Sequence, residues 1–344
     1  MPTRDPLVSI VMPVFNAGDY LLPALASLLE QSFQDWEMIC VDDGSQDKSG
    51  HILDWFASVD SRIRVIHQSN TGIVGALNRG CSAACAPLIC RMDCDDIALP
   101  NRLEAQVAYL RQHPECTVVG GAILEMDGEG DPLRVSRLPT QHADIVDGLL
   151  HRRTGHFHPT TMFRAEAFEA VGGYRAKYQW VEDHDLWLRM AQRGRLANLE
   201  DVLLCYRQHA SSVCWQRSGQ QRQLMNELLQ EAYRARGREL PAALLAETTV
   251  NRSAAGPGKW ARAAAKGGYP RSAFKHLRRL MDSDATRGYK IRMIAEVIAR
   301  LVVDVPRRIC SRSTPTIPTF PLWHERLSRE FKPTSQTNWQ ESAA

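Results

Sequence analysis

The segment Leu88-Ile-Cys-Arg-Met-Asp-Cys-Asp-Asp96 is an apolar run that ends in three closely spaced carboxylates. A short apolar run that stops abruptly is typical of a buried strand, so the carboxylates are expected in the turn beyond its carboxyl end. Carboxylates this crowded repel each other unless a cation or hydrogen-bond donors compensate. Their hard oxygens suit Mg²⁺ or Mn²⁺. The alternative is an acidic turn that caps the helix expected from Pro100.

The same arrangement of strand and acidic turn occurs nearer the N-terminus. Val8-Ser-Ile-Val-Met-Pro13 is a short β-branched run, and a second apolar run at 36–41 is followed by Asp42-Asp43-Gly44-Ser45. Carboxylates at this position can hydrogen-bond a base or a ribose. An ordinary Asp-Gly turn is the alternative.

Apolar spacing along the chain predicts strands that alternate with helices. This order predicts an α/β fold with a mainly parallel sheet and right-handed crossovers, in which ligands bind beyond the carboxyl ends of the strands. Both acidic turns fall at such ends. The predicted strands are 8–13, 36–41, 62–67, 88–92, 117–126 and 202–207, the predicted helices are 19–31, 49–59, 75–84, 100–113 and 183–193, and 128–139 is turn-rich.

Length and composition indicate a soluble protein with more than one part. The chain has 344 residues, and its net charge of +3 is too small to argue for a nucleic-acid partner. Past residue 218 the pattern is helical throughout. The expected parts are an α/β domain at 1–217, a basic helical region at 218–310, and a Pro-containing linker with a polar tail at 311–344.

The expected cellular location rests on two features that the sequence does not show, paired CxxC cysteines and a signal peptide. Its nine cysteines form no CxxC pair, and no signal peptide is recognised, so a reduced, cytoplasmic compartment is expected. No apolar stretch approaches the roughly 20 residues that span a bilayer.

A third acidic cluster, Glu182-Asp183-His184-Asp185, opens a helix rich in apolar residues. A carboxylate here can act as a general base if it reaches the proton of the acceptor. The alternative is a helix N-cap.

The three clusters taken together resemble glycosyltransferase family 2. The resemblance rests on Pro13-Val14-Phe15-Asn16, on Asp42-Asp43-Gly44-Ser45-x-Asp47, on Asn70-x-Gly72, on Asp93-x-Asp95-Asp96 and on Glu182-Asp183, in that order. It covers about 6–212, nearly two thirds of the chain. Weaker similarities lie at 76–80, 172–175 and 206–212. The family implies the GT-A fold, a Rossmann-like mixed sheet flanked by helices, and a nucleotide-diphosphate sugar as donor.

The resemblance also implies roles for individual residues. Asp183 is expected as the catalytic base, with Glu182 the second choice. The metal, Mn²⁺ or Mg²⁺, is expected on Asp95, with Asp93 and His209 as further contacts. Asp96 and His158 are expected near the donor sugar or the acceptor, although strand packing accounts equally well for 156–161. The residues expected around the nucleotide are Pro13, Val14, Phe15, Asn16, Asp42, Asp43, Gly72 and Asp93.

One residue departs from a simple metal site. Because side chains alternate along a strand, Arg91 and Asp93 are expected on one face, where the guanidinium can pair with the carboxylate and compete with a metal.

The sequence therefore predicts an inverting glycosyltransferase that uses a UDP-sugar in envelope polysaccharide or glycolipid synthesis. A sugar-nucleotide nucleotidyltransferase is the first alternative, although the turn after the first strand lacks the Gly-rich basic loop that holds a triphosphate. A non-catalytic nucleotide-sugar-binding protein is the second. The acceptor is expected to be a saccharide or a lipid-linked molecule. The basic helices are expected either to touch an anionic membrane or only to pack on the catalytic domain.

Overall fold

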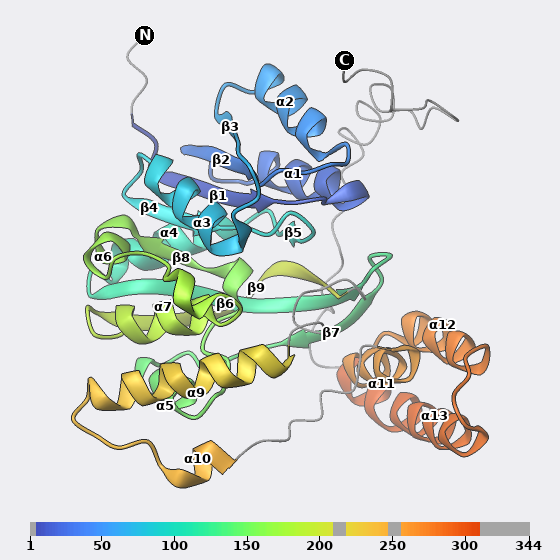
Figure 1. Cartoon of the computed structure of the whole chain (residues 1–344). Coiled ribbons are helices and arrows are strands. Elements are labelled where there is room, and N and C mark those ends of the chain that lie inside the picture. Colours follow the sequence, from blue (N-terminus) through green and yellow to red (C-terminus); the bar gives the residue numbers. More distant parts are fainter. Residues whose placement is uncertain (1–4, 209–217, 247–255, 310–344) are drawn as a thin grey trace.

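The computed structural model describes residues 5–208, 218–246 and 256–309. Its strands are β1 (Val8–Val14), β2 (Trp36–Asp42), β3 (Ile63–His67), β4 (Leu88–Arg91), β5 (Ile97–Ala98), β6 (Cys116–Asp127), β7 (Pro132–Ser136), β8 (Met162–Arg164) and β9 (Arg195–Gln208). In the described ranges they form one sheet in the order β3-β2-β1-β4-β8-β6-β9-β5, and β7 pairs with β6 outside this path (Figure 1).

The helices flank this sheet and continue beyond it. They are α1 (Leu21–Leu29), α2 (Ser49–Val59), α3 (Gly72–Ala83), α4 (Arg102–Gln112), α5 (His142–Leu150), α6 (Ala165–Ala170), α7 (Glu182–Met190), α9 (Ser218–Arg234), α10 (Ala242–Ala246), α11 (Pro257–Gly267), α12 (Pro270–Met281) and α13 (Arg287–Ile309). None of them, within the described ranges, combines the length and apolarity that a bilayer crossing requires.

The sheet is mixed. β1 lies between β2 and β4 and runs parallel to both, and β3 continues this parallel half beyond β2. β8 reverses the direction, since it is antiparallel to both β4 and β6. The carboxyl ends of β1, β2 and β4 therefore meet at one edge, which is where the predicted acidic turns begin.

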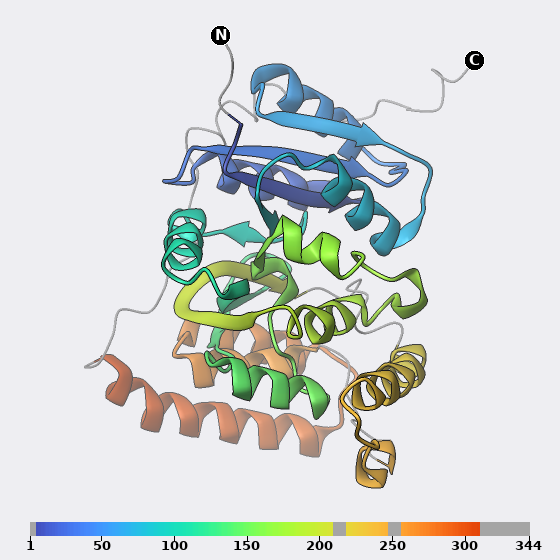
Figure 2. The ribbon, with the colours of Figure 1, turned by 90° about the vertical axis from the view of Figure 1, so that its left-hand side faces the viewer.

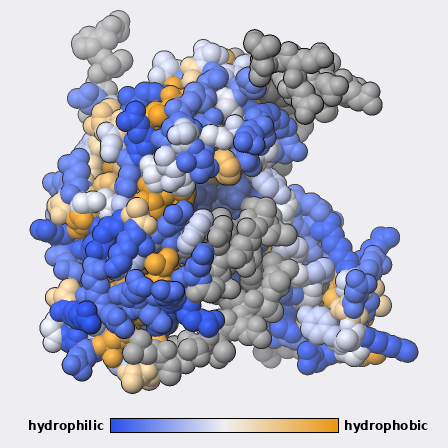
Figure 3. All heavy atoms as spheres, in the orientation of Figure 1, coloured by the Kyte–Doolittle hydropathy of each residue, from blue (hydrophilic) through white to orange (hydrophobic). Residues whose placement is uncertain are grey.

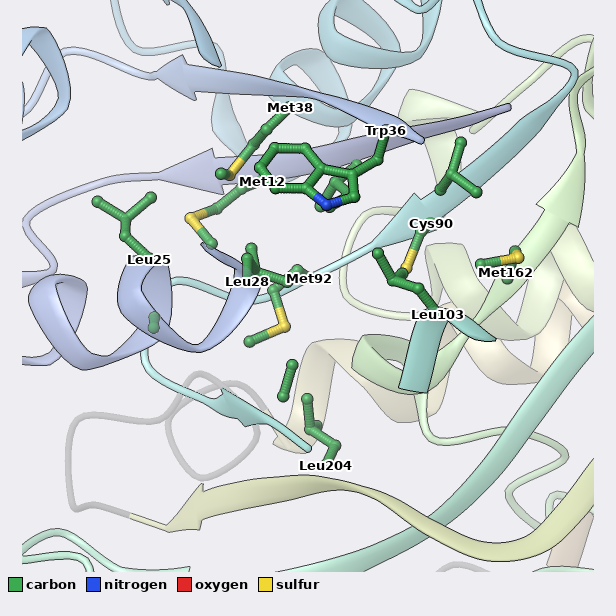
Figure 4. Packing of buried hydrophobic residues seen from close by; sticks show 14 of the residues in the cluster. Met12, Leu25, Leu28, Trp36, Met38, Cys90, Met92, Leu103, Met162 and Leu204 are labelled. Carbon is green, nitrogen blue, oxygen red and sulfur yellow. The ribbon is translucent and has the colours of Figure 1, made fainter. Parts of the chain in front are cut away.

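Alternation along β1 divides the core into two layers. Val8, Ile10, Met12 and Val14 pack in a cluster with residues of α1, α2 and α4, whereas Val11 packs on the other side with α3 and α7. Figure 4 shows the first layer, in which Met12 and Met38 from neighbouring strands lie against Leu25 and Leu28 of α1. Each fully buried side chain of this size contributes about 1.5–3 kcal/mol.

The second layer joins α9 to the helices that cover the sheet. Leu228, Leu229 and Tyr233 of α9 are buried in one cluster with Trp187 of α7 and Ile145 of α5. α9 therefore packs on the same core as α7, the helix that carries the predicted base.

The helices α11, α12 and α13 form a separate group at the edge of the sheet (Figures 1 and 2). Leu133 of β7 is buried among Ala261, Ala264 and Ala273 of this group. Buried Asp127, at the end of β6, pairs with Lys275 and lies 2.9 Å from Nε2 of His276. The group is thus fixed to the β6–β7 hairpin by both apolar and ionic contacts.

Two sequence predictions of secondary structure need correction. The segment 128–139 was predicted as turn-rich, but it contains β7, whose residues 132–136 pair with β6. The strand predicted at 202–207 is the end of a longer β9, which runs parallel to β6 from Arg195. Pro132 in β7 and the charged residues in both strands conceal them in the sequence, and their stability depends on pairing with a distant partner.

Candidate active site

The turn after β4 gathers the carboxylates that the sequence singled out. One oxygen from each of Asp93, Asp95 and Asp96 lies within 4.8 Å of the others. Asp96 is fully buried, and its Oδ2 has no hydrogen-bond partner. Burial and the neighbouring carboxylates raise the pKa of Asp96 well above its usual range. A buried, unpartnered oxygen among crowded carboxylates fits a hard divalent cation, which the residues of this turn are able to hold.

Arg91 lies beside this turn and pairs with Asp93, as the alternation along the strand predicted. The residue is only 6% exposed, and the side-chain Nε and Nη1 have no hydrogen-bond partner. Burial raises the pKa of Asp93 to about 6, although Arg91 acts in the opposite direction. The pair therefore partly neutralises the acidic turn.

Arg207 of β9 anchors the same turn from the opposite side. Its Nε donates to the Asp95 carbonyl at 2.8 Å, and its backbone N–H donates to Oδ1 of Asp96 at 2.8 Å. The guanidinium also donates to the Gly128 carbonyl at 3.2 Å and lies 4.7 Å from the ring centroid of Tyr20. Arg207 therefore fixes the position of the acidic turn, although it contributes no ligand atom to it.

The predicted nucleotide residues lie at the ends of β1 and β2. Pro13 and Val14 are paired in register with Val41 and Asp42. Phe15 is 51% exposed just beyond β1. Asn16 has a φ of 50°, and it is tied to the neighbouring turn because its Oδ1 accepts from the backbone N–H of Gln46 at 2.8 Å.

The carboxylates of Asp42 and Asp43 are largely engaged by residues 67–72, at and beyond the end of β3. Asp42 lies 2.9 Å from Nδ1 of His67. Asp43 accepts from the backbone N–H of Thr71 and from that of Gly72, both at 2.8 Å. Gly72 has a φ of +79°, which favours glycine at this position. Asp43 therefore holds the loop before α3 against the end of β2.

The predicted base opens α7. Asp183 is half-buried and accepts from the backbone N–H of His184 at 2.7 Å. Glu182 beside it has a buried Oε2 without a partner. Burial, with Asp183 adjacent, raises the pKa of Glu182 to about 7.

Arg91 connects this pair with the acidic turn. Burial disfavours its charge, but its pKa is nevertheless raised, and the carboxylates that favour its charge include Asp93 and Glu182. One guanidinium is therefore close enough to interact with residues of both acidic clusters, although the clusters are about 90 positions apart in the sequence.

His158 and His156 lie in the interior instead of at a surface. Nε2 of His158 is 2.8 Å from the Tyr174 hydroxyl, and Nδ1 of His156 is 2.7 Å from Oδ1 of Asn198. Both rings lie edge-on to Trp187. Burial lowers the pKa of both, to about 4 for His156. His209, predicted as a metal or diphosphate contact, falls outside the described residues.

Comparison with known proteins identifies the family. The family described as "Glycosyl transferase family 2" matches residues 9–172. The chain is 34% identical over 212 residues to the putative glycosyltransferase EpsE of Bacillus subtilis, which covers 60% of this chain and 75% of EpsE. The chain belongs to glycosyltransferase family 2. It is also 31% identical to the amylovoran biosynthesis glycosyltransferase AmsE of Erwinia amylovora, over 60% of this chain and 78% of AmsE.

Solved structures show the fold of this glycosyltransferase. Staphylococcus aureus TarS 1–349 in complex with UDP-GlcNAc superposes with a TM-score of 0.51 at 16% identity, covering 88% of this chain and 91% of that one. The mannosyltransferase PcManGT from Pyrobaculum calidifontis, in complex with GDP-Man and Mn²⁺, superposes with a TM-score of 0.50 at 16% identity, covering 91% and 89%. The predicted GT-A fold with a helical C-terminal part is confirmed. Because the chain belongs to this family, the alternative of a sugar-nucleotide nucleotidyltransferase is excluded.

Sequence reasoning did not assign a role to Arg207. It lies in the similarity noted at 206–212, but an arginine on a strand gives no indication that it donates to a turn more than a hundred residues away. Only the pairing of β9 with β5, which continues the acidic turn, brings them together.

Proposed function

We propose that the enzyme transfers a sugar from a UDP-sugar to an acceptor hydroxyl with inversion at the anomeric carbon. The observation that carries the proposal is the position of Arg91, whose guanidinium interacts with the acidic turn at Asp93 and with Glu182 beside the base. This electrostatic link supports a single site that both acidic clusters border. The complexes of TarS with UDP-GlcNAc and of PcManGT with GDP-Man support a nucleotide sugar as the donor.

Asp93, Asp95 and Asp96 are the residues that would hold Mn²⁺ or Mg²⁺. When bound, the cation supplies charge neutralisation for a departing diphosphate. The Mn²⁺ in PcManGT supports this assignment. The exposed ring of Phe15 at the end of β1 offers a face for the base, and the loop shaped by Asp43 and Gly72 borders the same end of the sheet.

Asp183 is our choice for the general base. A base must reach the hydroxyl whose proton it takes, and Asp183 is half-buried at the start of α7, whereas Oε2 of Glu182 is buried. Asp183 takes the proton while the acceptor oxygen attacks the anomeric carbon opposite the nucleotide, and the bond from that carbon to the departing nucleoside diphosphate breaks. A single displacement of this kind inverts the configuration.

The test is a transfer assay with a panel of UDP- and GDP-sugars and Mn²⁺, with nucleotide release as the readout and NMR of the product anomer. Asp183→Asn is expected to bind UDP normally but to lose about 10²–10⁴-fold in transfer rate. The matched variant Glu182→Gln is expected to retain most of the rate. A retained anomeric configuration, or Asp183→Asn with near-normal turnover, contradicts the mechanism. Absence of nucleotide release with every donor favours the non-catalytic alternative.

The names of the relatives support an envelope saccharide as the acceptor. AmsE is named for amylovoran biosynthesis, and WbnJ of Escherichia coli, 29% identical over 211 residues, is named for O-antigen biosynthesis. We propose a saccharide or a lipid-linked saccharide as the acceptor class.

The helical group supports contact with an anionic membrane. Residues 257–301 carry eleven Lys or Arg against three acidic residues. The surface of this group is mostly hydrophilic with small hydrophobic patches (Figure 3), and its exposed apolar side chains include Phe274 and Met281 of α12 and Ile291 and Ile298 of α13. Basic helices with exposed apolar side chains bind anionic surfaces. Liposome flotation with and without phosphatidylglycerol tests this, and protein that stays at the bottom in both cases contradicts it.

A further inference from the structure

The turn between β6 and β7 is built around the buried carboxylate of Asp127. Its Oδ1 accepts from the backbone N–H of Glu129 at 3.0 Å and from that of Asp131 at 2.9 Å. Its Oδ2 faces α12, where it pairs with Lys275 and lies 2.9 Å from Nε2 of His276. Asp127 and His276 are each no more than 1% exposed. One carboxylate therefore shapes the turn and also joins it to α12.

The same turn supplies an acceptor to Arg207, the residue that anchors the acidic turn. The carbonyl of Gly128, which follows Asp127, accepts from Nη1 of Arg207 at 3.2 Å. Through its Nε and its backbone N–H, Arg207 also donates to Asp95 and Asp96, both at 2.8 Å. A continuous series of contacts thus leads from α12 to two of the residues proposed to hold the cation.

A second contact joins α11 to the end of β9. Nε1 of Trp260 donates to Oε1 of Gln208 at 3.2 Å, and Gln208 directly follows Arg207 in the strand. Nε2 of Gln208 donates in turn to Glu125 on β6. The indole also lies against the ring of His276, with 5.2 Å between the centroids. α11 therefore holds the strand end that carries Arg207, while α12 holds the turn that accepts from it.

Apolar packing connects the same two parts of the molecule. Tyr269, between α11 and α12, packs on a cluster that contains Ile97 of β5. Ile97 directly follows Asp96 in the chain. At Gly267 an added Cβ would lie 2.1 Å from the carbonyl oxygen of Leu133 on β7, so this close approach of α11 to the hairpin requires glycine. The two helices are thus closely fitted to the strands beside the acidic turn.

We propose that α11 and α12 are a positioning element of the cation site. The inference rests on the proposed function, which places a divalent cation on the acidic turn. Trp260 and His276 fix the ends of β9 and β6, and they thereby hold Arg207 where it anchors that turn. Neither is a proposed ligand, and each acts through Arg207. Residues that orient metal ligands from outside the ligand shell commonly set metal affinity, so the helical group is expected to determine how tightly the cation binds.

The first measurement is the Mn²⁺ affinity of the full-length protein, from the electron paramagnetic resonance signal of free Mn²⁺. His276→Leu removes the contact with Asp127, and Trp260→Phe removes the donor to Gln208 but keeps an aromatic ring. Each is expected to weaken Mn²⁺ binding by about 2–30-fold, the range that substitutions between two coupled sites produce. In the conservative variant His276→Gln, the amide can still donate to the carboxylate, so most of the affinity should be recovered.

Val297→Ala is the matched control for a loss of stability. Val297 of α13 is buried in the core of the helical group, and an apolar side chain makes no hydrogen bond to the strand ends. The variant should melt at a lower temperature, as His276→Leu does, but it should keep the wild-type Mn²⁺ affinity. An equal loss of Mn²⁺ affinity in Val297→Ala would assign the effect to general destabilisation and overturn the positioning role.

Combination with Arg207→Met tests the route of the effect. Substitutions that act through one network are not additive. If His276 acts through Arg207, His276→Leu should therefore cost no further Mn²⁺ affinity in the Arg207→Met background. Full additivity of the two losses overturns the route, and wild-type affinity in both His276→Leu and Trp260→Phe overturns the positioning role itself.

Hydrogen exchange gives the reciprocal test. Because coupling between two sites is reciprocal, Mn²⁺ should slow amide exchange in residues 257–281 of the wild-type protein, and it should do so less in Arg207→Met. Exchange in 257–281 that saturating Mn²⁺ leaves unchanged contradicts the coupling.

These readouts separate the inference from the proposed function. A wild-type protein that binds no Mn²⁺ contradicts the cation site and the positioning role together. Mn²⁺ binding that is equally tight in the wild type and in the variants of α11 and α12 overturns only the positioning role. The predicted loss of affinity, in a protein that releases no nucleotide from any donor, leaves the positioning role standing and contradicts the transfer function.

Discussion

Replacing Arg207 by methionine tests whether β9 positions the acidic turn. The change removes two hydrogen bonds of the guanidinium, one to the Asp95 carbonyl at 2.8 Å and one to the Gly128 carbonyl at 3.2 Å. Hydrogen bonds that involve a charged group contribute about 1.5–3 kcal/mol each, so the loss of both is expected to lower the free energy of unfolding by roughly 3–6 kcal/mol. Removal of a residue that orients metal ligands typically weakens metal affinity about 10–100-fold, and Arg207→Met is expected to lose Mn²⁺ affinity by that factor.

Arg164→Met is the matched control for this experiment. Arg164 also donates to backbone carbonyls, those of Cys116 at 2.9 Å and Leu110 at 2.8 Å, but it has no contact with the acidic turn. Urea unfolding gives the stability of each variant, and the electron paramagnetic resonance signal of free Mn²⁺ gives the affinity. Both variants should lose stability, whereas only Arg207→Met should lose Mn²⁺ affinity. Unchanged Mn²⁺ affinity in Arg207→Met, or an equal loss in Arg164→Met, refutes the positioning role.

Two further variants test the charges of the fold by their pH dependence. Burial, together with Asp183, raises the pKa of Glu182 to about 7, so the folded state loses stability as pH rises from the unfolded value of about 4.3 through 7. Glu182→Gln is therefore expected to melt at a higher temperature than wild type at pH 8 and at the same temperature near pH 4; equal melting at both pH values contradicts this. Contacts with His276 and Lys275 hold the pKa of Asp127 well below its usual range despite burial. The ionised carboxylate therefore stabilises the folded state above pH 4, and this stabilisation is lost as pH falls. Asp127→Asn is expected to cost about 3–5 kcal/mol in urea unfolding at pH 7 and progressively less below pH 4, and a pH-independent difference would falsify the ionic role.

The parallel half of the sheet could be predicted because each strand there is an apolar run with a turn beyond it. The run at 88–91 is buried on both faces, and its alternation also predicted the pairing of Arg91 with Asp93. The acidic clusters could be placed at strand ends for the same reason. The sequence also predicted the helix opened by Glu182 and Asp183, since carboxylates are common in the first turn.

What could not be predicted depends on contacts between distant segments. The segment of β7 was predicted as turn-rich because the strand is stabilised by distant residues, through pairing with β6 and burial of Leu133 against α11 and α12. The histidines at 156 and 158 looked like candidates for a sugar site, and only tertiary packing places their rings against Trp187. The domain boundary at 217/218 stays a prediction, and α9, which follows it, packs on the core that includes α7.

The central claim is that the acidic turn and the start of α7 border one cleft that binds a cation and a nucleotide. The most direct measurement is anomalous diffraction from crystals grown with Mn²⁺ and UDP. We expect a manganese peak among the carboxylates of Asp93, Asp95 and Asp96, with the diphosphate beside it and Asp183 open to the same cleft. A peak elsewhere on the protein, or Asp183 facing a surface separate from the bound nucleotide, would contradict it.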